Sequence, residues 1–316
     1  MDSTQWLLDS DPAIVWQAMR HLRDVAPAET AAVRARVPRE GLGAEILARQ
    51  ESDGSWRRAD APVWLSTLFT LQLLRATGID PADSAVEAAI GRLESHLRWN
   101  NQPYWELRSA DSGGNLFFEG EEEPCINGGV LSLGAYFGRA TQSLARRLIG
   151  EQLDDGGWNC EAPKSSRSSF NTTICVLEGL LEYERAAGSA PAIAAARRRG
   201  EQYLLERSLF RRLTTGEVVD PAFLEFAFPP RYHYDVLRAL DYLRAADVRI
   251  DARMSEAIHL VESKQQADGR WLLDRAYEEA LAVPVGESKG EPSRWNTLRA
   301  LRVLRWYQRQ KLEGRG

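Results

Sequence analysis

Three copies of one short motif constrain the fold of this chain more than any other feature. The pattern Q-x-x-D-G-x-W occupies residues 50–56, 152–158 and 265–271, at spacings of 102 and 113 residues. Each copy precedes the pattern Thr-x-x-x-Leu-x-x-Leu, which begins at Thr67, Thr173 and Thr297. An element that recurs at long, similar intervals indicates a repeat architecture, in which each unit packs on the next.

Helical periodicity fills the segments between the motifs, whereas strand patterns are almost absent. Apolar residues fall on one stripe at 82–97, 141–153 and 252–266, as expected of outer helices, and a further outer helix is expected at 28–36. Segments that are apolar nearly all round, as expected of inner helices, cover 12–25, 63–78, 125–138, 172–188, 234–247 and 295–310. Inner and outer segments alternate along the chain.

This alternation predicts an all-α fold, with residues 1–316 forming a single α/α toroid domain. About six inner helices would surround an axis and about six outer helices would surround them. An open solenoid is the alternative. We favour closure because both chain ends are helical and apolar enough to meet.

Each copy of the motif combines groups suited to joining two helices. Asp-Gly favours a tight turn, because glycine adopts positive φ without strain. The tryptophan supplies a large flat face, and the glutamine can hydrogen-bond backbone groups left free at helix ends. A motif that occurs three times is more readily explained by a structural role than by catalysis, so we interpret it as a clasp between consecutive helical hairpins.

Composition and charge exclude several classes of protein. The net charge of −5 argues against a nucleic-acid-binding protein, which would need a basic face. The N-terminus lacks the basic and apolar pattern of a signal peptide, and no run of about 18 apolar residues suggests a membrane span. Three cysteines make a poor disulfide framework. These features predict a cytoplasmic protein with reduced thiols.

The motif resembles the repeat of squalene and terpene cyclases and of the β-subunits of protein prenyltransferases. The resemblance extends over the whole chain, and the segments "PCINGGVLSLGAYFG", "DGGWNC" and "SSFNTTICVLEGLL" are also similar to those of small bacterial squalene-cyclase-like proteins. It implies a toroid with a central cavity that binds isoprenoid chains.

Cyclisation that starts by protonation uses the pattern D-x-D-D in these cyclases, and this chain lacks it. The nearest approach is Asp9-Ser10-Asp11-Pro12, where Asp11 is better explained as a helix N-cap with proline in the first turn. The D-D-x-x-D pattern of ionisation-initiated cyclases is also missing. The sequence therefore disfavours both of these chemistries.

The resemblance to prenyltransferases suggests a zinc site instead. Those β-subunits bind zinc through D-x-C at the start of one inner helix and a histidine at the start of the next. Here the first pattern corresponds to Glu123-Pro124-Cys125, and Asn171 stands where the histidine is expected. Cys160 precedes the second helix and could replace that ligand, so Glu123, Cys125 and Cys160 are the candidate zinc ligands.

Other candidate residues lie near the predicted starts of inner helices. His233 and Asp235 are the candidate catalytic residues, with His233 as a general acid, a general base or a further ligand and Asp235 also placed to cap its helix. The acidic run 119–123 is expected to form a solvated loop. Aromatic residues in two long connections are the candidate wall of an apolar site: Trp99, Tyr104, Trp105, Phe117, Phe118, Phe228 and Tyr232.

Together these features favour an enzyme or binding protein for an isoprenoid or similar apolar small molecule. One alternative is a non-catalytic toroid that serves as an interaction scaffold for a helical partner of the kind that prenyltransferase β-subunits use. Another is a zinc-dependent toroid cyclase that acts on peptides, although the C-H-G signature of the lanthionine cyclases is missing. A carbohydrate-active α/α barrel would need paired carboxylates across an aromatic groove, which the sequence does not place.

Overall fold

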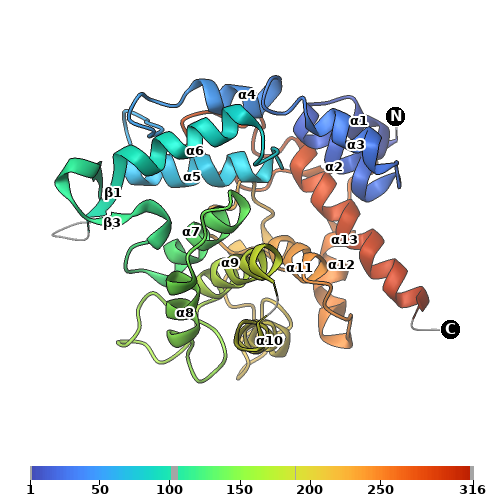
Figure 1. Cartoon of the computed structure of the whole chain (residues 1–316). Helices are drawn as coiled ribbons and strands as arrows, with labels where there is room; N and C mark the ends of the chain where they lie inside the picture. The colour runs from blue at the N-terminus through green and yellow to red at the C-terminus, as the bar shows by residue number, and fades with distance from the viewer. Residues whose placement is uncertain (1, 101–105, 189, 314–316) are drawn as a thin grey trace. The chain divides into compact units, whose positions relative to one another are not determined.

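The computed structural model describes residues 2–100, 106–188 and 190–313, and in this part the chain is mostly helical (Figure 1). The α-helices are α1 (Ser3–Leu8), α2 (Pro12–Leu22), α3 (Pro27–Arg34), α4 (Gly41–Ala48), α5 (Val63–Ala76), α6 (Ser84–His96), α7 (Pro124–Tyr136), α8 (Gln142–Gly150), α9 (Phe170–Ala187), α10 (Pro191–Glu206), α11 (Val236–Ala245), α12 (Ser255–Ser263) and α13 (Arg294–Glu313). The ten helices predicted by residue range are all confirmed, with ends displaced by a few residues.

Local signals explain where several helices begin. The Asp11 carboxylate accepts the backbone N–H of Ala13 at 2.8 Å, and Pro12 opens α2, which confirms the predicted N-cap. Asp83 caps α6 and Ser169 caps α9 in the same way. These caps satisfy backbone donors that have no partner within their own helices.

The chain divides into two compact units, each built from segments distant in sequence. The first unit comprises residues 1–34, 201–277 and 286–316, and the second comprises residues 35–200 and 278–285. In the first unit α13 packs against α2 and α11. In the second unit α7 packs against α5 and α9.

Short strands occupy parts of the chain that the sequence gave no reason to assign as sheet. In the connection before α7, β1 (Leu97–Asn100) pairs antiparallel with β2 (Glu106–Ser109) and with β3 (Asn115–Leu116). In the first unit, β4 (Trp271–Leu272) pairs antiparallel with β5 (Pro292–Ser293). Strands of two to four residues are too short to show an alternating pattern, which is why the sequence did not reveal them.

The two ends of the chain meet within the first unit, as predicted. Arg294, at the start of α13, donates a hydrogen bond to the carbonyl of Asp9 at 2.9 Å and places its guanidinium 4.3 Å from the ring centre of Trp6. Farther along α13, Arg305 donates to the carbonyl of His21 at 3.1 Å. The closed ring of six inner and six outer helices stays a prediction.

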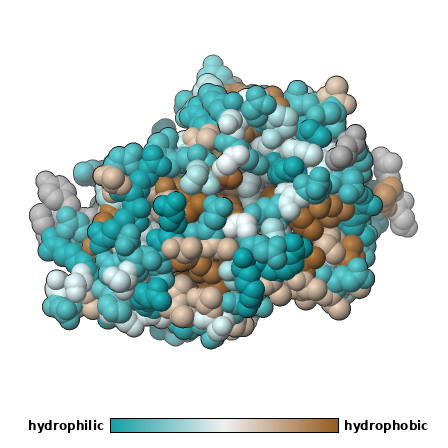
Figure 2. Space-filling model, turned by 90° about the horizontal axis from the view of Figure 1, so that it is seen from above, coloured by the Kyte–Doolittle hydropathy of each residue, from teal (hydrophilic) through white to brown (hydrophobic). Residues whose placement is uncertain are grey.

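Hydrophilic residues cover most of the face drawn in Figure 2, with hydrophobic residues in scattered groups between them. Among the helices that the structure describes, none has both the length and the apolar composition needed to cross a bilayer.

Candidate metal centre

The three tryptophans of the motif are fully buried and make the same two contacts in each copy. Each indole N–H donates to a carbonyl near the end of the preceding helix: Trp56 to Ile46 at 2.7 Å, Trp158 to Leu148 at 2.6 Å, and Trp271 to Val261 at 2.7 Å. Each tryptophan backbone N–H donates to the threonine of the downstream pattern: Thr67 at 3.2 Å, Thr173 at 3.0 Å, and Thr297 at 3.0 Å. The motif therefore joins the helix that precedes it to the helix that follows it.

The glutamine and the glycine of the motif add a third helix in the first two copies. Gln50 donates to the carbonyl of Ala89 in α6 at 2.8 Å, and Gln152 donates to the carbonyl of Ala196 in α10 at 2.8 Å. Gly156 adopts φ of +97°, and a Cβ there would lie 2.7 Å from a backbone carbonyl oxygen of α10. Only glycine permits both this conformation and this approach. These contacts support the interpretation of the motif as a clasp.

The second copy differs from the others at the position two residues after its tryptophan. Cys160 stands there, whereas the equivalent positions hold Arg58 and Leu273. The loop from Cys160 to α9 is closed by Asn159, which donates to the carbonyl of Arg167 at 2.6 Å, and by the Asp155 carboxylate, which accepts from Ser168 N–H at 3.0 Å. The clasp therefore holds Cys160 in a fixed place beside the start of α9.

The start of α7 is held equally firmly. Asn127 accepts the backbone N–H of Glu121 at 2.8 Å and donates to the carbonyl of the same residue at 3.0 Å. Arg147 on α8 donates to the carbonyls of Glu121 and Glu122. Glu123 is the N-cap residue of α7, and Cys125 lies in its first turn. The loop and the helix together fix the positions of Glu123 and Cys125.

A close crossing of α7 and α9 brings these segments together (Figure 1). A Cβ at Gly128 would lie 2.5 Å from the backbone of Cys175, and a Cβ at Gly179 would lie 2.4 Å from the carbonyl oxygen of Gly128. Two helices can approach this closely only where side chains are missing. The crossing lies about one turn from Cys125, so the first turns of both helices also lie side by side.

Glu123, Cys125 and Cys160 converge at this point. One ligand atom from each, two thiol sulfurs and a carboxylate oxygen, lies within 4.8 Å of the other two. The sulfur of Cys125 lies 3.5 Å from a carboxylate oxygen of Glu123, and that of Cys160 lies 3.4 Å from the hydroxyl of Thr172. All three candidate ligands are half-buried. The structure thus brings together the three residues that the sequence analysis proposed as zinc ligands.

The electrostatics of the cluster disfavour three negative charges in the protein alone. Hydrogen bonding to Cys160 and burial raise the pKa of the Cys125 thiol, whereas the same hydrogen bond lowers the pKa of the Cys160 thiol. Burial raises the pKa of the Glu123 carboxyl, and the charge of Glu161 raises it further. A bound cation would offset these penalties, because it stabilises the ionised form of every group that contacts it.

The expectation of a solvated loop at residues 119–123 is wrong for Glu121. Glu121 is 1% exposed. Its carboxylate accepts two hydrogen bonds, one from the backbone N–H of Glu123 at 2.8 Å and one from the backbone N–H of Glu122. Burial raises the pKa of the Glu121 carboxyl to about 8. The sequence gave no sign of this burial, which results from packing against α7 and α8.

His233 lies in the first unit, just before α11. Its ring stacks at 3.9 Å on Tyr277 and lies 4.1 Å from the ring of Tyr232. Burial and the charges of three arginines, Arg231 foremost, lower the pKa of His233 to about 4. The imidazole is therefore neutral at pH 7. The sequence analysis did not identify its stacking partner Tyr277.

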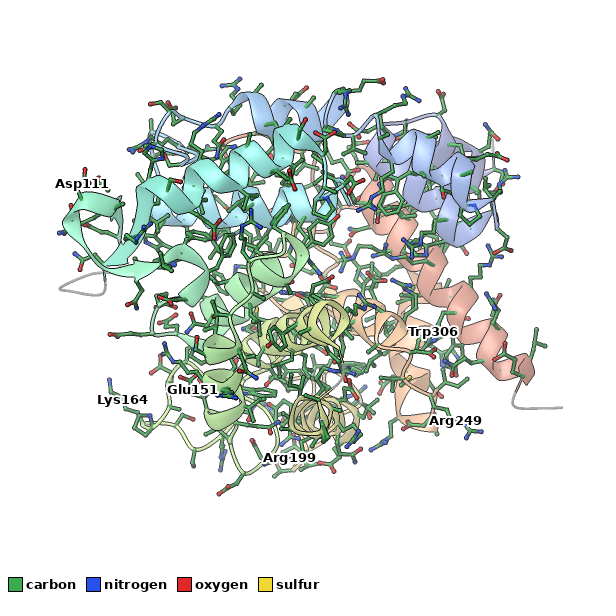
Figure 3. The ribbon with its side chains drawn as sticks, viewed as in Figure 1. Asp111, Glu151, Lys164, Arg199, Arg249 and Trp306 are labelled. Carbon is green, nitrogen blue, oxygen red and sulfur yellow. The ribbon has the colours of Figure 1, made fainter. Side chains whose placement is uncertain are left out.

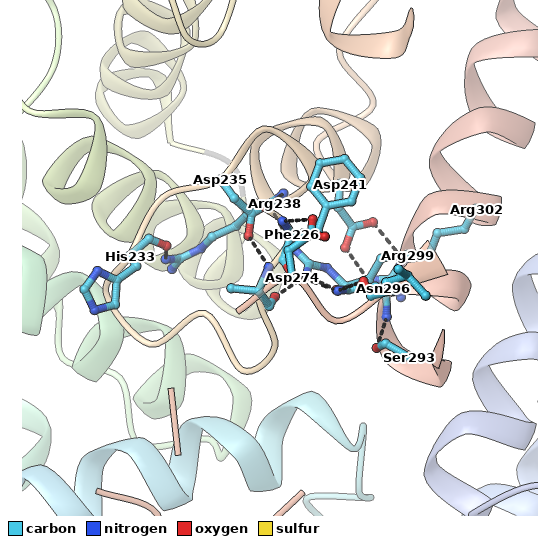
Figure 4. Close-up of polar contacts among 12 residues, drawn as sticks. Phe226, His233, Asp235, Arg238, Asp241, Asp274, Ser293, Asn296, Arg299 and Arg302 are labelled. Atoms are coloured by element: carbon cyan, nitrogen blue, oxygen red, sulfur yellow. Dashed lines mark hydrogen bonds and ion pairs between the residues drawn. The ribbon is translucent and has the colours of Figure 1, made fainter. Parts of the chain in front are cut away.

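Asp235 belongs to a buried polar network at the starts of α11 and α13 (Figure 4). Its carboxylate accepts the backbone N–H of Arg238 at 2.7 Å, which makes it the N-cap of α11, and it lies 3.8 Å from the guanidinium of Arg299. Asn296 donates to the carbonyls of Phe226 and Leu272, each at 3.1 Å. The network thereby joins α11 and α13 to β4 and to the loop that precedes α11.

The predicted wall aromatics that the structure describes are mostly packed against one another. Trp99 is fully buried in β1, stacks on Phe117 at 5.5 Å, and donates its indole N–H to the Phe117 carbonyl at 2.8 Å. Phe118 packs edge-on against Phe117, and Phe228 stacks on Trp295 at 4.3 Å. Tyr104 and Trp105 lie outside the described residues.

No known protein family matches the chain, and no characterised protein matches it in sequence. Solved structures that resemble it include a protein from Actinoplanes, with 14% identity over 95% of this chain and 90% of that chain and a TM-score of 0.47. Another is the type II terpene cyclase MstE from Scytonema, with 16% identity over 93% of this chain and 85% of that chain and a TM-score of 0.46. A variant of MstE gives 16% identity, coverage of 95% and 86%, and a TM-score of 0.48. At these scores the resemblance does not identify the chemistry of this chain.

Proposed function

We propose that Glu123, Cys125 and Cys160 bind one zinc ion, and that the chain is an isoprenoid-binding protein or enzyme of the terpene cyclase and prenyltransferase type. The observation that carries the proposal is the convergence of three ligand atoms within 4.8 Å. In a tetrahedral zinc site, bonds of about 2.0–2.3 Å place neighbouring ligand atoms about 3.5–3.8 Å apart. The sulfur of Cys125 and the carboxylate of Glu123 already have this separation, at 3.5 Å.

The composition of the cluster favours a reactive site over a purely structural one. Structural zinc sites are closed by four protein ligands, whereas catalytic sites have three and keep one position open. Three candidate ligands are found among the residues that the structure describes, and none is a histidine. The cluster therefore differs from the Cys-Cys-His set of the lanthionine cyclases, and this difference disfavours the peptide-cyclase alternative.

When bound, zinc would act as a Lewis acid and lower the pKa of a thiol or water at its open position. The residues of the chain provide the rest of the site. Thr172 contacts the Cys160 sulfur from the first turn of α9 and would orient it. The MstE complex in the comparison contains geranylgeranyl dihydroxybenzoate, a prenylated substrate. For this chain we propose an isoprenoid or similar apolar small molecule as the ligand, on the basis of the repeat motif.

The first experiment measures the zinc content of the purified chain by elemental mass spectrometry. We expect about one zinc per chain, and we expect it to be lost in the Cys125→Ser and Cys160→Ser variants because two thiolates supply most of the affinity. Cys175→Ala is the matched control, since Cys175 is buried within α9 and outside the cluster. Cobalt substitution should give a thiolate-to-metal absorption band in the unmodified chain and in the control.

Two outcomes would contradict the proposal. A folded chain that binds neither zinc nor cobalt would exclude the metal site, and retention of metal by both cysteine variants would place the metal elsewhere. The ligand class is tested in the same preparations by tryptophan fluorescence titration with farnesol, against n-dodecanol as an unbranched control. An equal fluorescence response to both alcohols would mean that the site binds apolar molecules in general and does not recognise an isoprenoid chain.

A further inference from the structure

A second site lies in the first unit, at the C-terminal ends of α2, α11 and α13. It is a pocket of about 850 Å³ that shares no residue with the cysteine cluster. Figure 3 labels two of its lining residues, Trp306 on α13 and Arg249 on the segment that follows α11. A volume of this size lies in the range of pockets that bind small organic molecules, about 300–1,000 Å³.

The pocket is strongly cationic. Seven arginine or lysine side chains line it against three aspartate or glutamate side chains. The whole chain carries a net charge of −5, so this local excess of positive charge is not a general property of the surface. His21 adds no charge at neutral pH, because burial and nearby arginines lower its pKa to about 3.

Partner contacts divide the cations of the pocket into two groups. Arg244 and Arg302 are both paired with Asp241, and Arg305 is paired with Asp24, so these three are engaged within the protein. Among the described residues, four other lining cations have no ion-pair partner: Arg20, Arg249, Arg309 and Lys311. All four side chains are exposed to solvent. They are free to contact an anion.

Helix dipoles alone do not explain this arrangement. Each helix C-terminus carries the equivalent of about −0.5 charge, and basic residues often gather there. Three such termini amount to about −1.5 charge. Seven cationic side chains line the pocket against three acidic ones, and Asp241 pairs with two of the cations, so an excess of about three positive charges remains, which is more than the helix ends can balance.

Trp306 gives the pocket an apolar wall and an unused donor. Its ring lines the cavity, and its buried indole N–H has no hydrogen-bond partner among the described residues. A buried donor without a hydrogen-bond partner is destabilising. An aromatic face beside a cluster of arginines fits a ligand that carries both a planar or apolar group and an anionic group.

We propose that this pocket is a binding site for a soluble organic di- or triphosphate. Arginine pairs well with phosphate oxygens, and the volume exceeds what inorganic phosphate would fill. Among the described lining residues, the four cations without an ion-pair partner outnumber the two carboxylates without one, Asp247 and Glu313, which favours a polyanionic ligand. The site is independent of the zinc proposal, because the two sites have separate residues and separate ligands. Failure of either leaves the other unaffected.

Isothermal titration calorimetry with ATP and with inorganic pyrophosphate tests the proposal. We expect one site for each probe, weaker binding at high salt, and at least about tenfold weaker binding in the double variant Arg249→Gln, Arg309→Gln. One charge–charge attraction at contact distance in water gives a factor of about five, so loss of two gives more than ten. The control is Arg146→Gln with Arg198→Gln, two exposed arginines that do not line the pocket.

Each outcome decides the matter. No binding of either probe to the unmodified chain, or equal binding by the pocket variant, overturns the proposal. Sedimentation with phosphatidylcholine vesicles that contain phosphatidylserine separates the two sources of phosphate. If the chain binds these vesicles through Arg249 and Arg309 but does not bind ATP or pyrophosphate, the site recognises lipid headgroups and the proposed soluble ligand is wrong.

Discussion

At the scale of single residues, Trp56, Trp158 and Trp271 show how one side chain can join several elements. Each ring is fully buried, and each indole N–H donates to a backbone carbonyl in the last turn of the helix that precedes the motif. The same residue type makes the same bond three times, because each copy connects two consecutive helices in the same way. These contacts explain the recurrence of tryptophan without any role in catalysis.

Replacement of Trp158 by Phe should therefore destabilise the chain. It removes the 2.6 Å bond to the Leu148 carbonyl and leaves part of the ring volume empty. The lost bond and the small cavity together predict a decrease of about 2–4 kcal/mol in the free energy of unfolding. Urea denaturation followed by circular dichroism measures it.

Trp306→Phe is the matched control for this change. The Trp306 indole N–H is buried without a partner among the described residues, so its removal relieves an unsatisfied donor. The expected loss is about 1 kcal/mol or less, since only some packing is lost. Equal losses in the two variants would show that ring volume, and not the hydrogen bond, makes the motif stabilising.

At the scale of elements, the crossing of α7 and α9 determines the metal centre. Gly128 and Gly179 allow the two backbones to touch, and Cys125 follows the first residue of α7. A wider crossing would separate Cys125 from Cys160, which the clasp fixes before α9. The candidate site thus depends on two glycines that contribute no ligand.

Gly128→Ala should reduce both stability and zinc content. The added Cβ would lie 2.5 Å from the Cys175 backbone, so the helices must separate. Overpacking of this kind costs about 1–3 kcal/mol. Gly91→Ala in α6 is the control, because no atom lies within 4 Å of its new Cβ and alanine favours helix by about 0.5–1 kcal/mol. Thermal unfolding measures the stability of both variants, and elemental analysis measures their zinc content. An unchanged zinc content in Gly128→Ala would contradict the dependence of the metal centre on the helix crossing.

At the scale of the whole molecule, two half-buried histidines make folding depend on pH. Burial is the main reason that the pKa of His21 falls to about 3 and that of His233 to about 4. The unfolded chain therefore takes up these protons first as pH falls. The stabilisation is fully present above the ordinary histidine pKa of 6.5 and is lost as pH decreases toward the folded values.

Between about pH 7.5 and pH 5, His21 alone should account for a loss of about 2 kcal/mol in the free energy of unfolding. The His21→Gln variant cannot take up this proton. Between the two pH values its free energy of unfolding should therefore decrease less than that of the unmodified chain, and the difference between the two decreases should be about that amount. Urea denaturation of both chains at the two pH values gives the difference. Parallel pH profiles would mean that His21 does not carry the effect.

The features that depend on neighbours along the chain could be predicted from the amino-acid sequence alone. Apolar stripes located the helices, Asp11 and Pro12 marked a helix start, and the motif indicated a joining role before any contact was known. It also identified Glu123, Cys125 and Cys160 as candidate ligands, through the resemblance of "EPC" to the prenyltransferase pattern. Such signals survive because helix periodicity and turn preference are local properties.

Only the tertiary structure decided which distant side chains meet. Cys160 lies 35 residues after Cys125 in sequence, and their proximity results from a close helix crossing that no local pattern reveals. Burial of Glu121 likewise arises from its contacts with α7 and α8. The cationic pocket combines the ends of three helices from both termini and the middle of the chain. Long-range packing sets these distances and burials, and it depends on the shapes of many side chains at once.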